Sequence, residues 1–205
     1  MKKVFVIAEA GVNHNGSVVL AKKLIDAAHD AGADAVKFQT FNSEKCLCKT
    51  APKAEYQVRT MGKNISQLEM VKKLELNAAE HRELVAHCKK KRITFLSTAF
   101  DLDSVDLLCD LGVSTFKIPS GELTNLPLVR KIGGLKKKII LSTGMANIKE
   151  IKETVDVLIG QGTLKRNITI LHCNTEYPTP FEDVNLLAML NIRDVFKVED
   201  RKSVV

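Results

Sequence analysis

The sequence predicts an α/β protein whose parallel strands form an incomplete barrel of the TIM type. Short apolar runs alternate with amphipathic helical stretches along the 205 residues, which is typical of right-handed βαβ units in a parallel sheet. Nearly every apolar run ends in polar residues, and a barrel collects the carboxyl ends of all its strands at one mouth. We count six such units, whereas a complete barrel needs eight and typically about 250 residues. We therefore expect a truncated barrel domain over residues 1–205, with about six of the eight units present.

The first half of the chain supplies three of the expected strands. They lie at residues 3–10, 34–40 and 92–100, and helices follow them. Gly32 ends the first helix, as glycine often does at a helix C-terminus. The buried stripe of that helix is expected to be Leu20, Leu24, Ala28 and Ala31. A long insertion at 42–80, polar at first and helical later, interrupts the alternation, and such insertions often serve a site.

The second half repeats the same unit three times. Strand runs with their polar ends are expected at 115–122, 138–145 and 167–174, with a last helix near 184–195. Pro127 suits the first turn of a short helix. Asn147, with Glu150 three positions later, predicts a capped helix. The buried stripe of that helix is expected to be Ile148, Ile151, Val155 and Leu158.

Composition and charge exclude several classes of protein. The net charge is +7, but much of the basic excess lies in runs at 88–92 and 135–139, and helix C-termini favour cations. Aromatic residues are 5% of the chain, too few to suggest the exposed aromatic side chains of a nucleic-acid surface. We find no apolar stretch long enough for a membrane span. The five cysteines show no paired spacing, which favours a reducing, cytoplasmic compartment.

Two lysines within strands are the strongest sign of a binding site. Side chains alternate between the faces of a strand, so Lys37 and Gln39 share one face while Val36 and Phe38 take the other. Lys117 alternates in the same way with its apolar neighbours. Because a buried, unpaired charge is costly, each lysine is expected to meet anions. We expect both at the mouth of the barrel.

Hydroxyls and glycine amides at the strand ends extend this prediction to an anion pocket. Lysines, serines and exposed amides near PSGE (119–122) and STGM (142–145) suit a phosphate, and Glu9 and Glu122 could move protons or bind a hydroxylated substrate. Residues better explained as turn or cap formers are Ser97, Thr143 and Asn174. Tyr177 suits either a rigid turn or a substrate contact, and Lys117 could also act as a Schiff-base nucleophile.

Six ordered motifs carry a resemblance to a known family. They are IAEAGVNHNGS, AGADAVKFQTF, FLSTAFD, FKIPSGELTNLPLV, ILSTGM and LHCNTEYPTPFEDVNL, within residues 4–198. They resemble the sialic acid synthase family, whose members condense phosphoenolpyruvate with an N-acetylated aminosugar to give nonulosonic acids and release phosphate. The wording KIPSGE and CNTEYPTP is closer to the branch that makes N,N'-diacetyllegionaminic acid. The resemblance implies a phosphoenolpyruvate-dependent condensing transferase of carbohydrate biosynthesis.

The resemblance also implies roles for individual residues. The positions that match the phosphate and carboxylate contacts of phosphoenolpyruvate are Lys37, Thr98, Lys117, Ser120 and Ser142. Gln39 and Tyr177 match aminosugar contacts, and Thr175 stands where many members carry an asparagine. Glu9, Lys117 and Glu122 are the residues expected to act in catalysis, Glu122 by handling protons at the sugar aldehyde. Lys117 would then be an electrostatic residue rather than a nucleophile.

The C-terminal part of the family pattern is not found in this sequence. Family members continue into SDH and E(R/K)HF strands, whose histidines hold a divalent metal, manganese or magnesium, and then into a small antifreeze-like (SAF) domain that reaches across a homodimer. This chain ends in EDRKSVV. We therefore expect no metal ligands and no SAF domain here. The alternative to a synthase is an inactive fragment that binds only anions or a partner. An SDH and ERHF coding stretch in another frame after codon 205 would indicate a disrupted synthase.

Overall fold

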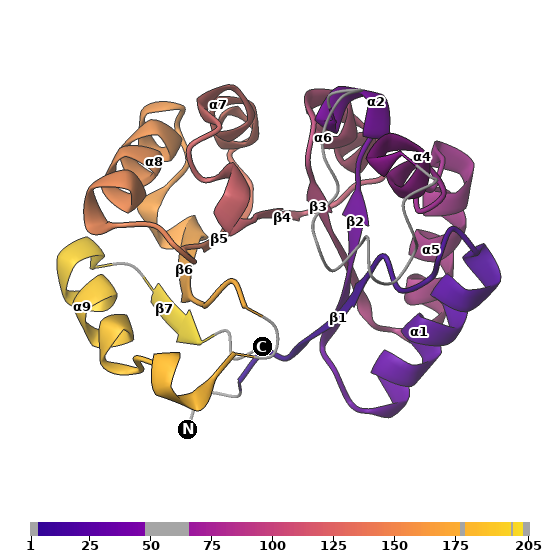
Figure 1. Cartoon of the computed structure of the whole chain (residues 1–205), viewed down its shortest axis with the longest axis horizontal. Coiled ribbons are helices and arrows are strands. Elements are labelled where there is room, and N and C mark those ends of the chain that lie inside the picture. The colour runs from indigo at the N-terminus through magenta and orange to yellow at the C-terminus, as the bar shows by residue number, and fades with distance from the viewer. Residues whose placement is uncertain (1–3, 48–65, 177–178, 198, 203–205) are drawn as a thin grey trace. The chain divides into compact units, whose positions relative to one another are not determined.

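The computed structural model describes residues 4–47, 66–176, 179–197 and 199–202. The chain divides into two compact units, residues 1–113 and 114–205. Both units are built from parallel strands and helices, as the sequence predicts (Figure 1).

The first unit holds three parallel strands covered by helices. Strand β1 pairs with β2, and β2 pairs with β3. Figure 1 shows α1 and α5 along the same side of these strands, where they pack on each other and on the strands. The elements are β1 (Ile7–Gly11), α1 (Val18–Asp30), β2 (Ala35–Thr40), α2 (Ser43–Cys46), α4 (Gln67–Lys72), α5 (Ala78–Lys91), β3 (Thr94–Ala99) and α6 (Leu102–Asp110).

The core of this unit confirms the predicted alternation in β2 and corrects the predicted stripe of α1. Val36 and Phe38 are fully buried with α1 and α5, while Lys37 and Gln39 are only half-buried. The predicted stripe of α1 is confirmed in part: Ala28 is buried and Leu24 packs partly buried against the same core, whereas Leu20 and Ala31 are exposed. The helix also buries Ala21 and Ile25, which the prediction missed. The small side chains of Ala21 and Ala28 let the helix approach the strands closely.

A buried relay of polar side chains joins the strands of this unit to α5. The Thr40 hydroxyl lies 2.7 Å from the Ser97 hydroxyl and 2.9 Å from His81 Nε2. His81 Nδ1 lies 3.0 Å from the Asn77 carbonyl, so it carries the proton and donates it there. Ser97, predicted as a turn or cap former, therefore has a structural role, but as a buried strand residue. Burial lowers the pKa of His81.

His14 is a second buried histidine in the same unit. Its Nδ1 accepts a hydrogen bond from the Gly16 amide at 3.0 Å, and its Nε2 has no partner among the described residues. Burial, and then the nearby His81, lower the pKa of His14. Both histidines are therefore held in the neutral form.

These two histidines predict that the first unit loses stability in mild acid. In the unfolded chain they titrate near the ordinary value of 6.5, and in the folded chain below it. Their contribution is thus complete above about pH 6.5 and is lost as the pH falls through that value towards the folded pKa. Urea unfolding at pH 7.5 and 5.5 should show the loss. The loss in the free energy of unfolding between the two pH values should be smaller in His81→Gln than in the unchanged chain. It should persist in His29→Gln, which changes an exposed histidine. Equal losses in the unchanged chain and in both variants would contradict the assignment.

The second unit continues the alternation with parallel strands β4 to β7, each paired with the next. In Figure 1 helices α7 and α8 lie side by side next to β5, and α9 lies beside β6 and β7. The elements are β4 (Thr115–Ile118), η1 (Ser120–Glu122), α7 (Leu126–Gly134), β5 (Lys138–Ser142), α8 (Ile148–Gly160), η2 (Lys165–Asn167), β6 (Ile168–His172), η3 (Phe181–Asp183), α9 (Leu187–Phe196) and β7 (Glu199–Lys202).

Local signals in this unit are confirmed closely. Pro127 lies in the first turn of α7, and Asn147 with Glu150 forms a capping box at the start of α8. Helix α8 buries three of the four predicted stripe residues, while Ile148 is largely exposed. Strand β7 was not predicted, because EDRK carries no apolar alternation. Its backbone nevertheless pairs with β6.

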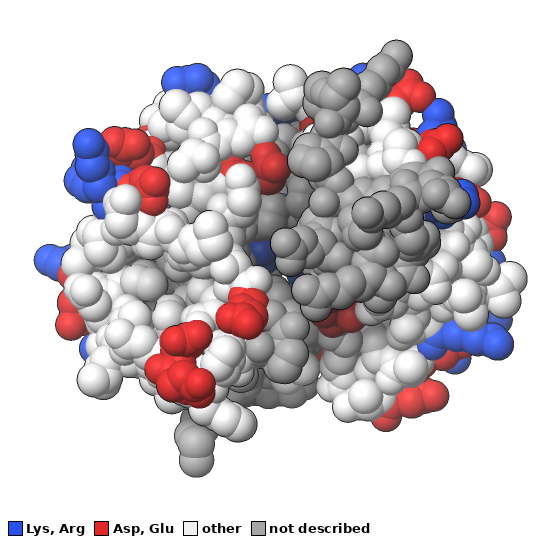
Figure 2. All heavy atoms as spheres, in the orientation of Figure 1, with Lys and Arg blue, Asp and Glu red and all other residues white. Residues whose placement is uncertain are grey.

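One of the two basic runs has the predicted structural explanation, whereas the run at 135–139 passes from the end of α7 into the start of β5 rather than lying in a helix. Lys89, Lys90 and Lys91 form the last turn of α5, where cations favour the helix dipole. On the face shown in Figure 2, Lys and Arg side chains are interspersed with Asp and Glu side chains rather than gathered in one field. Among the helices of the described ranges, none has the length and apolar character that a membrane crossing requires.

Candidate active site

In the first unit, Glu9, Lys37 and Gln39 gather on the face of the strands opposite the helices. Glu9 lies beside Lys37 in the register of β1 and β2, and the two side chains form an ion pair. The Lys37 side chain is 13% exposed and that of Glu9 46%, so the pair is open to solvent on one side. The register shifts between Glu9 and Gly11, which leaves Ala10 as an extra, bulged residue.

Gly11 and Thr98 complete this group. A side chain at Gly11 would begin 3.5 Å from Glu9 Oε1 and 3.8 Å from Gln39 Nε2, so both groups lie next to this glycine. Thr98 is buried and pairs in register with Gln39. The first unit thus brings together all four of its predicted site residues, with an ammonium, a carboxylate, an amide and a hydroxyl available to a polar ligand.

In the second unit, Lys117 and Ser142 share one face of the strands. Lys117 is 9% exposed, while its neighbours Phe116 and Ile118 are buried on the other face. Its Nζ donates to the Ile118 carbonyl at 3.3 Å. Lys117 pairs in register with Ile140, and Ser142 lies two residues beyond Ile140 on the same face of β5. The ammonium and the hydroxyl therefore lie on neighbouring strands.

A cradle of donors lies at the carboxyl ends of these strands, and we define it as Ser120, Ser142 and Gly144. The Gly144 amide donates to Ser120 Oγ at 2.8 Å, and Ser120 Oγ lies 3.6 Å from Cys173 Sγ. Ser142 lies close enough to Cys173 to favour its ionised form, and so contributes to lowering the pKa of the thiol. A side chain at Gly144 would meet Thr175 Cγ2 at 2.7 Å and Ser120 Oγ at 3.0 Å. The structure therefore brings Ser120, Ser142 and Thr175 close together, as predicted.

Glu122 lies at the end of η1, two residues after Ser120. Its Oε2 accepts a hydrogen bond from Asn125 Nδ2 at 2.6 Å, and the side chain is half-buried. Asn125 also caps α7. The carboxylate is thus held in place by a residue that is itself fixed by the start of a helix.

Of the remaining predicted residues, two have structural roles and one lies outside the described residues. The Thr143 hydroxyl donates to the Leu171 carbonyl at 2.8 Å, and Asn174 Nδ2 donates to the Asp183 carbonyl at 3.1 Å. Both therefore hold the fold locally, as their interpretation as turn formers suggests. Tyr177 lies outside the described residues.

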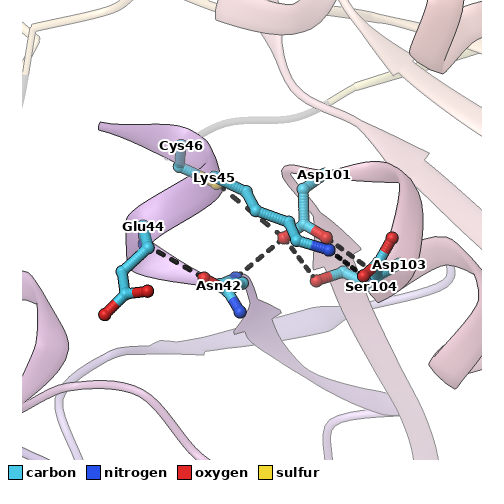
Figure 3. A network of polar contacts seen from close by, with 7 residues as sticks. All are labelled: Asn42, Glu44, Lys45, Cys46, Asp101, Asp103 and Ser104. Atoms are coloured by element: carbon cyan, nitrogen blue, oxygen red, sulfur yellow. Dashed lines mark hydrogen bonds and ion pairs between the residues drawn. The ribbon is translucent and has the colours of Figure 1, made fainter. Parts of the chain in front are cut away.

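Two residues of this region were missed by sequence reasoning. Cys173 was used only to infer the redox state of the compartment. It follows Leu171 by two positions, and Leu171 pairs in register with Ser142, so alternation would have placed the cysteine on the side of Ser142. Asp101 was overlooked although it ends the FLSTAFD motif. Its carboxylate accepts hydrogen bonds from the Asn42 amide at 2.7 Å and from the Ser104 amide and hydroxyl at 2.8 and 2.6 Å (Figure 3).

The Asp101 carboxylate joins the turn after β2 to the start of α6. Cys46 approaches it at 3.8 Å, and Lys45 forms an ion pair with Asp103 (Figure 3). On the other side of α2, the Ser43 amide and hydroxyl donate to Glu75 at 3.1 and 2.7 Å. These contacts fix the segment that directly follows Gln39 and Thr40.

The described residues do not form a metal site. Within residues 4–47, 66–176, 179–197 and 199–202, no three His, Cys, Asp or Glu side chains gather where they could hold a metal ion. The ammonium, hydroxyl and amide groups placed at the strand ends suit an anion, and the carboxylates of Glu9 and Glu122 lie among them.

Known proteins with the same arrangement include several synthases. The crystal structure of the N-acetylneuraminic acid (sialic acid) synthetase of Leptospira borgpetersenii, in complex with citrate, superposes with a TM-score of 0.83 at 31% identity, over 98% of this chain and 65% of that one. The N,N'-diacetyllegionaminic acid synthase of Campylobacter jejuni is 59% identical over 97% of this chain. The enzyme of the same name from Legionella pneumophila is 44% identical over 95%.

These likenesses define the class of protein: an α/β protein with the fold of an incomplete TIM-type barrel, akin to synthases of carbohydrate biosynthesis. The sequence profile of the NeuB family matches residues 24–200. The chain belongs to the NeuB family. It spans 60% of the length of the Campylobacter relative and 55% of that of the Legionella relative.

Proposed function

We propose that this chain is the barrel portion of a nonulosonic acid synthase, a transferase that condenses phosphoenolpyruvate with an N-acetylated aminosugar and releases phosphate. The family and the identity to the two legionaminic acid synthases support the product class. The observation that carries the proposal is the donor cradle of the second unit. Its hydroxyls and amides, with Lys117 on the same strands, supply the donors that a phosphate dianion requires.

The residues of each unit have separate roles in this proposal. In the second unit, Lys117 and the cradle serine hydroxyls bind the phosphate and carboxylate of phosphoenolpyruvate, with Thr175 as an additional donor. In the first unit, Lys37 and Thr98 bind the same substrate, and Gln39 contacts the aminosugar. Tyr177 is proposed as a second aminosugar contact.

The chemistry requires charge stabilisation and proton transfer. The C3 methylene carbon of phosphoenolpyruvate attacks the aldehyde carbon of the open sugar. A C–C bond forms from the C2=C3 electron pair, the aldehyde oxygen takes up a proton, and C2 is left as an oxocarbenium ion. Water then adds to C2 with loss of a proton, and the C2–O bond to phosphate breaks from this tetrahedral intermediate, which releases phosphate and leaves a ketone at C2. Lys117 and Lys37 stabilise the anionic charge that develops. Glu122, fixed by Asn125, handles the proton at the aldehyde oxygen, and Glu9 orients Lys37.

The cellular setting is part of the proposal. The described cysteines, Cys46, Cys88, Cys109 and Cys173, are free thiols, which suits a reducing compartment such as the cytoplasm. We further propose that the whole protein is a homodimer and uses manganese or magnesium, as its family does, with ligands from beyond the described residues. A bound divalent cation would supply polarisation of the sugar carbonyl.

Anion binding by Lys117→Ala tests the proposal. Calorimetry with inorganic phosphate and phosphoenolpyruvate should show binding to the unchanged chain and a loss of at least about tenfold in affinity in the variant, because a buried ammonium bound to a dianion is a strong charge-assisted contact. Lys138→Ala removes the same charge from an exposed lysine of β5 and should change the affinity less than about twofold.

Lys138→Ala controls for the change in net charge, and circular dichroism controls for a change in folding. The spectra of Lys117→Ala and Lys117→Met should match that of the unchanged chain. The methionine variant is included because it retains the apolar stem of the lysine. Equal affinity in the unchanged chain and in both Lys117 variants would rule out the assigned role.

A further inference from the structure

The sulfur of Cys173 lies where the donors of the cradle converge. Ser120 Oγ is 3.6 Å from Cys173 Sγ. The thiol itself donates to the Leu171 carbonyl at 3.8 Å. Ser142 and the backbone of Thr143 and Gly144 lie close enough to the sulfur to act on its ionisation. Polar groups from the turn after β4 and from the end of β5 thus surround one polarisable atom.

The direction of the hydrogen bond to Ser120 shows which proton is available. The Gly144 amide donates to Ser120 Oγ at 2.8 Å, so one lone pair of that oxygen is occupied. The hydroxyl proton of Ser120 is left to donate, and Cys173 Sγ is the acceptor within reach. A neutral sulfur is a weak acceptor, and an anionic oxygen in the same place would take the proton in preference.

Ionisation of the Cys173 thiol would make its sulfur a stronger acceptor for the Ser120 proton. Burial alone raises the pKa of Cys173, but hydrogen bonds from Ser142, Ser120 and the Thr143 and Gly144 amides outweigh it, so the pKa is lowered. Cys88, buried without such donors, has its pKa raised to about 12. The donors that favour a thiolate are the kind that favour a phosphate oxygen.

We propose that Cys173 is the resting occupant of the phosphate cradle, and that its thiolate excludes a phosphate-class dianion from the same donors. The inference rests on the proposed function of the cradle as a phosphate site. Cys173 is thereby a positioning residue: as a thiol it holds the Ser120 and Ser142 hydroxyls ready for the ligand, and as a thiolate it retains them and repels the ligand. Anion affinity therefore falls as the pH rises through the pKa of this thiol.

Sulfate is the appropriate probe, because it stays a dianion over the whole pH range and so contributes no titration of its own. Calorimetry at pH 6.5 and 9.0 should show sulfate affinity falling at least about fivefold in the unchanged chain and less than about twofold in Cys173→Ser, whose hydroxyl stays neutral. Other charged groups on the surrounding elements are Lys117 on β4, Glu122 on η1, and His172 and Glu176 in and after β6. They are present in both proteins, so their effects cancel.

Alkylation provides a readout that does not depend on anion affinity. Iodoacetamide reacts with the thiolate, and peptide mapping reports the rate at each cysteine separately. The pH midpoint for Cys173 should rise in Ser120→Ala, because one donor to the thiolate is removed, and sulfate at pH 7 should slow the reaction in the unchanged chain. Cys88 serves as the internal reference and should stay unreactive throughout.

The outcomes separate this inference from the proposed function. Sulfate binding with the same pH dependence in the unchanged chain and in Cys173→Ser would overturn the role of Cys173 alone. An unchanged alkylation midpoint in Ser120→Ala would do the same. If no variant binds sulfate at any pH, both the phosphate cradle and the competition within it are refuted.

Discussion

Gly144→Ala should weaken phosphate binding and destabilise the second unit. A methyl group at this position would lie 2.7 Å from Thr175 Cγ2, 3.0 Å from Ser120 Oγ and 3.2 Å from the Cys173 carbonyl. Two of these neighbours belong to the cradle or its rim, and the third is backbone that cannot rotate away. Relieving such overlap typically costs about 1–3 kcal/mol. It would also pull Ser120 from the Gly144 amide, so phosphate affinity should fall at least about tenfold.

Urea unfolding and calorimetry on the same samples measure the two effects. Gly160→Ala is the matched control, since it adds the same methyl group within this unit at the end of α8, where nothing lies within 4 Å. It should be neutral or stabilising by up to about 1 kcal/mol. If Gly144→Ala bound phosphate as tightly as Gly160→Ala, the close packing around Ser120 would have no part in anion binding.

Asp101→Asn should destabilise the first unit by about 2–4 kcal/mol. Asp101 is 8% exposed, and its two oxygens accept from the Asn42 amide, the Ser104 amide and the Ser104 hydroxyl. An amide of the same shape can keep only one oxygen, so its NH₂ group would face a donor that then has no acceptor. The turn after β2 would lose its contact with α6, and the helix cap would weaken or the turn would detach.

The neighbouring Asp103→Asn isolates the effect of burial. Asp103 pairs with Lys45, but its side chain is 68% exposed, so its loss should cost less than about 1 kcal/mol. The difference between the two variants in the free energy of unfolding, from urea titrations, is the quantity of interest. A difference near zero would show that the Asp101 carboxylate does not hold the turn after β2 against the start of α6.

The regular part of the fold could be predicted because each element carries its own local signal. Alternation placed Lys37 and Gln39 on one face of β2, and the Asn147 and Glu150 pair gave the start of α8. Strand β7 could not be predicted, since its four residues are polar and show no apolar alternation, although the strand pairs with β6. The stripe of α1 was predicted only in part, because the apolar run at 18–21 leaves open which of its residues begins the packed face.

Sequence reasoning can propose a site residue where a residue type is out of place, and not where its environment is ordinary. A lysine inside a strand has little structural reason to be there, so the sequence alone marks Lys37 and Lys117 as candidates. Cys173 and Asp101 are ordinary residues in ordinary positions, and their significance comes from neighbours distant in the chain, such as Ser120 and Asn42. Periodicity along one segment does not report such contacts.

Because of the bulge at Ala10, β1 should tolerate the evolutionary loss of a residue at this position better than the gain of one. Glu9 faces Lys37 and Gly11 faces Phe38, so one residue is in excess on this strand. A lineage that lost Ala10 could keep both pairings by straightening the strand, at the cost of one small buried methyl group. A lineage that gained a residue there would have to widen the bulge or slip the register, and a slip by one position turns the carboxylate towards the helices.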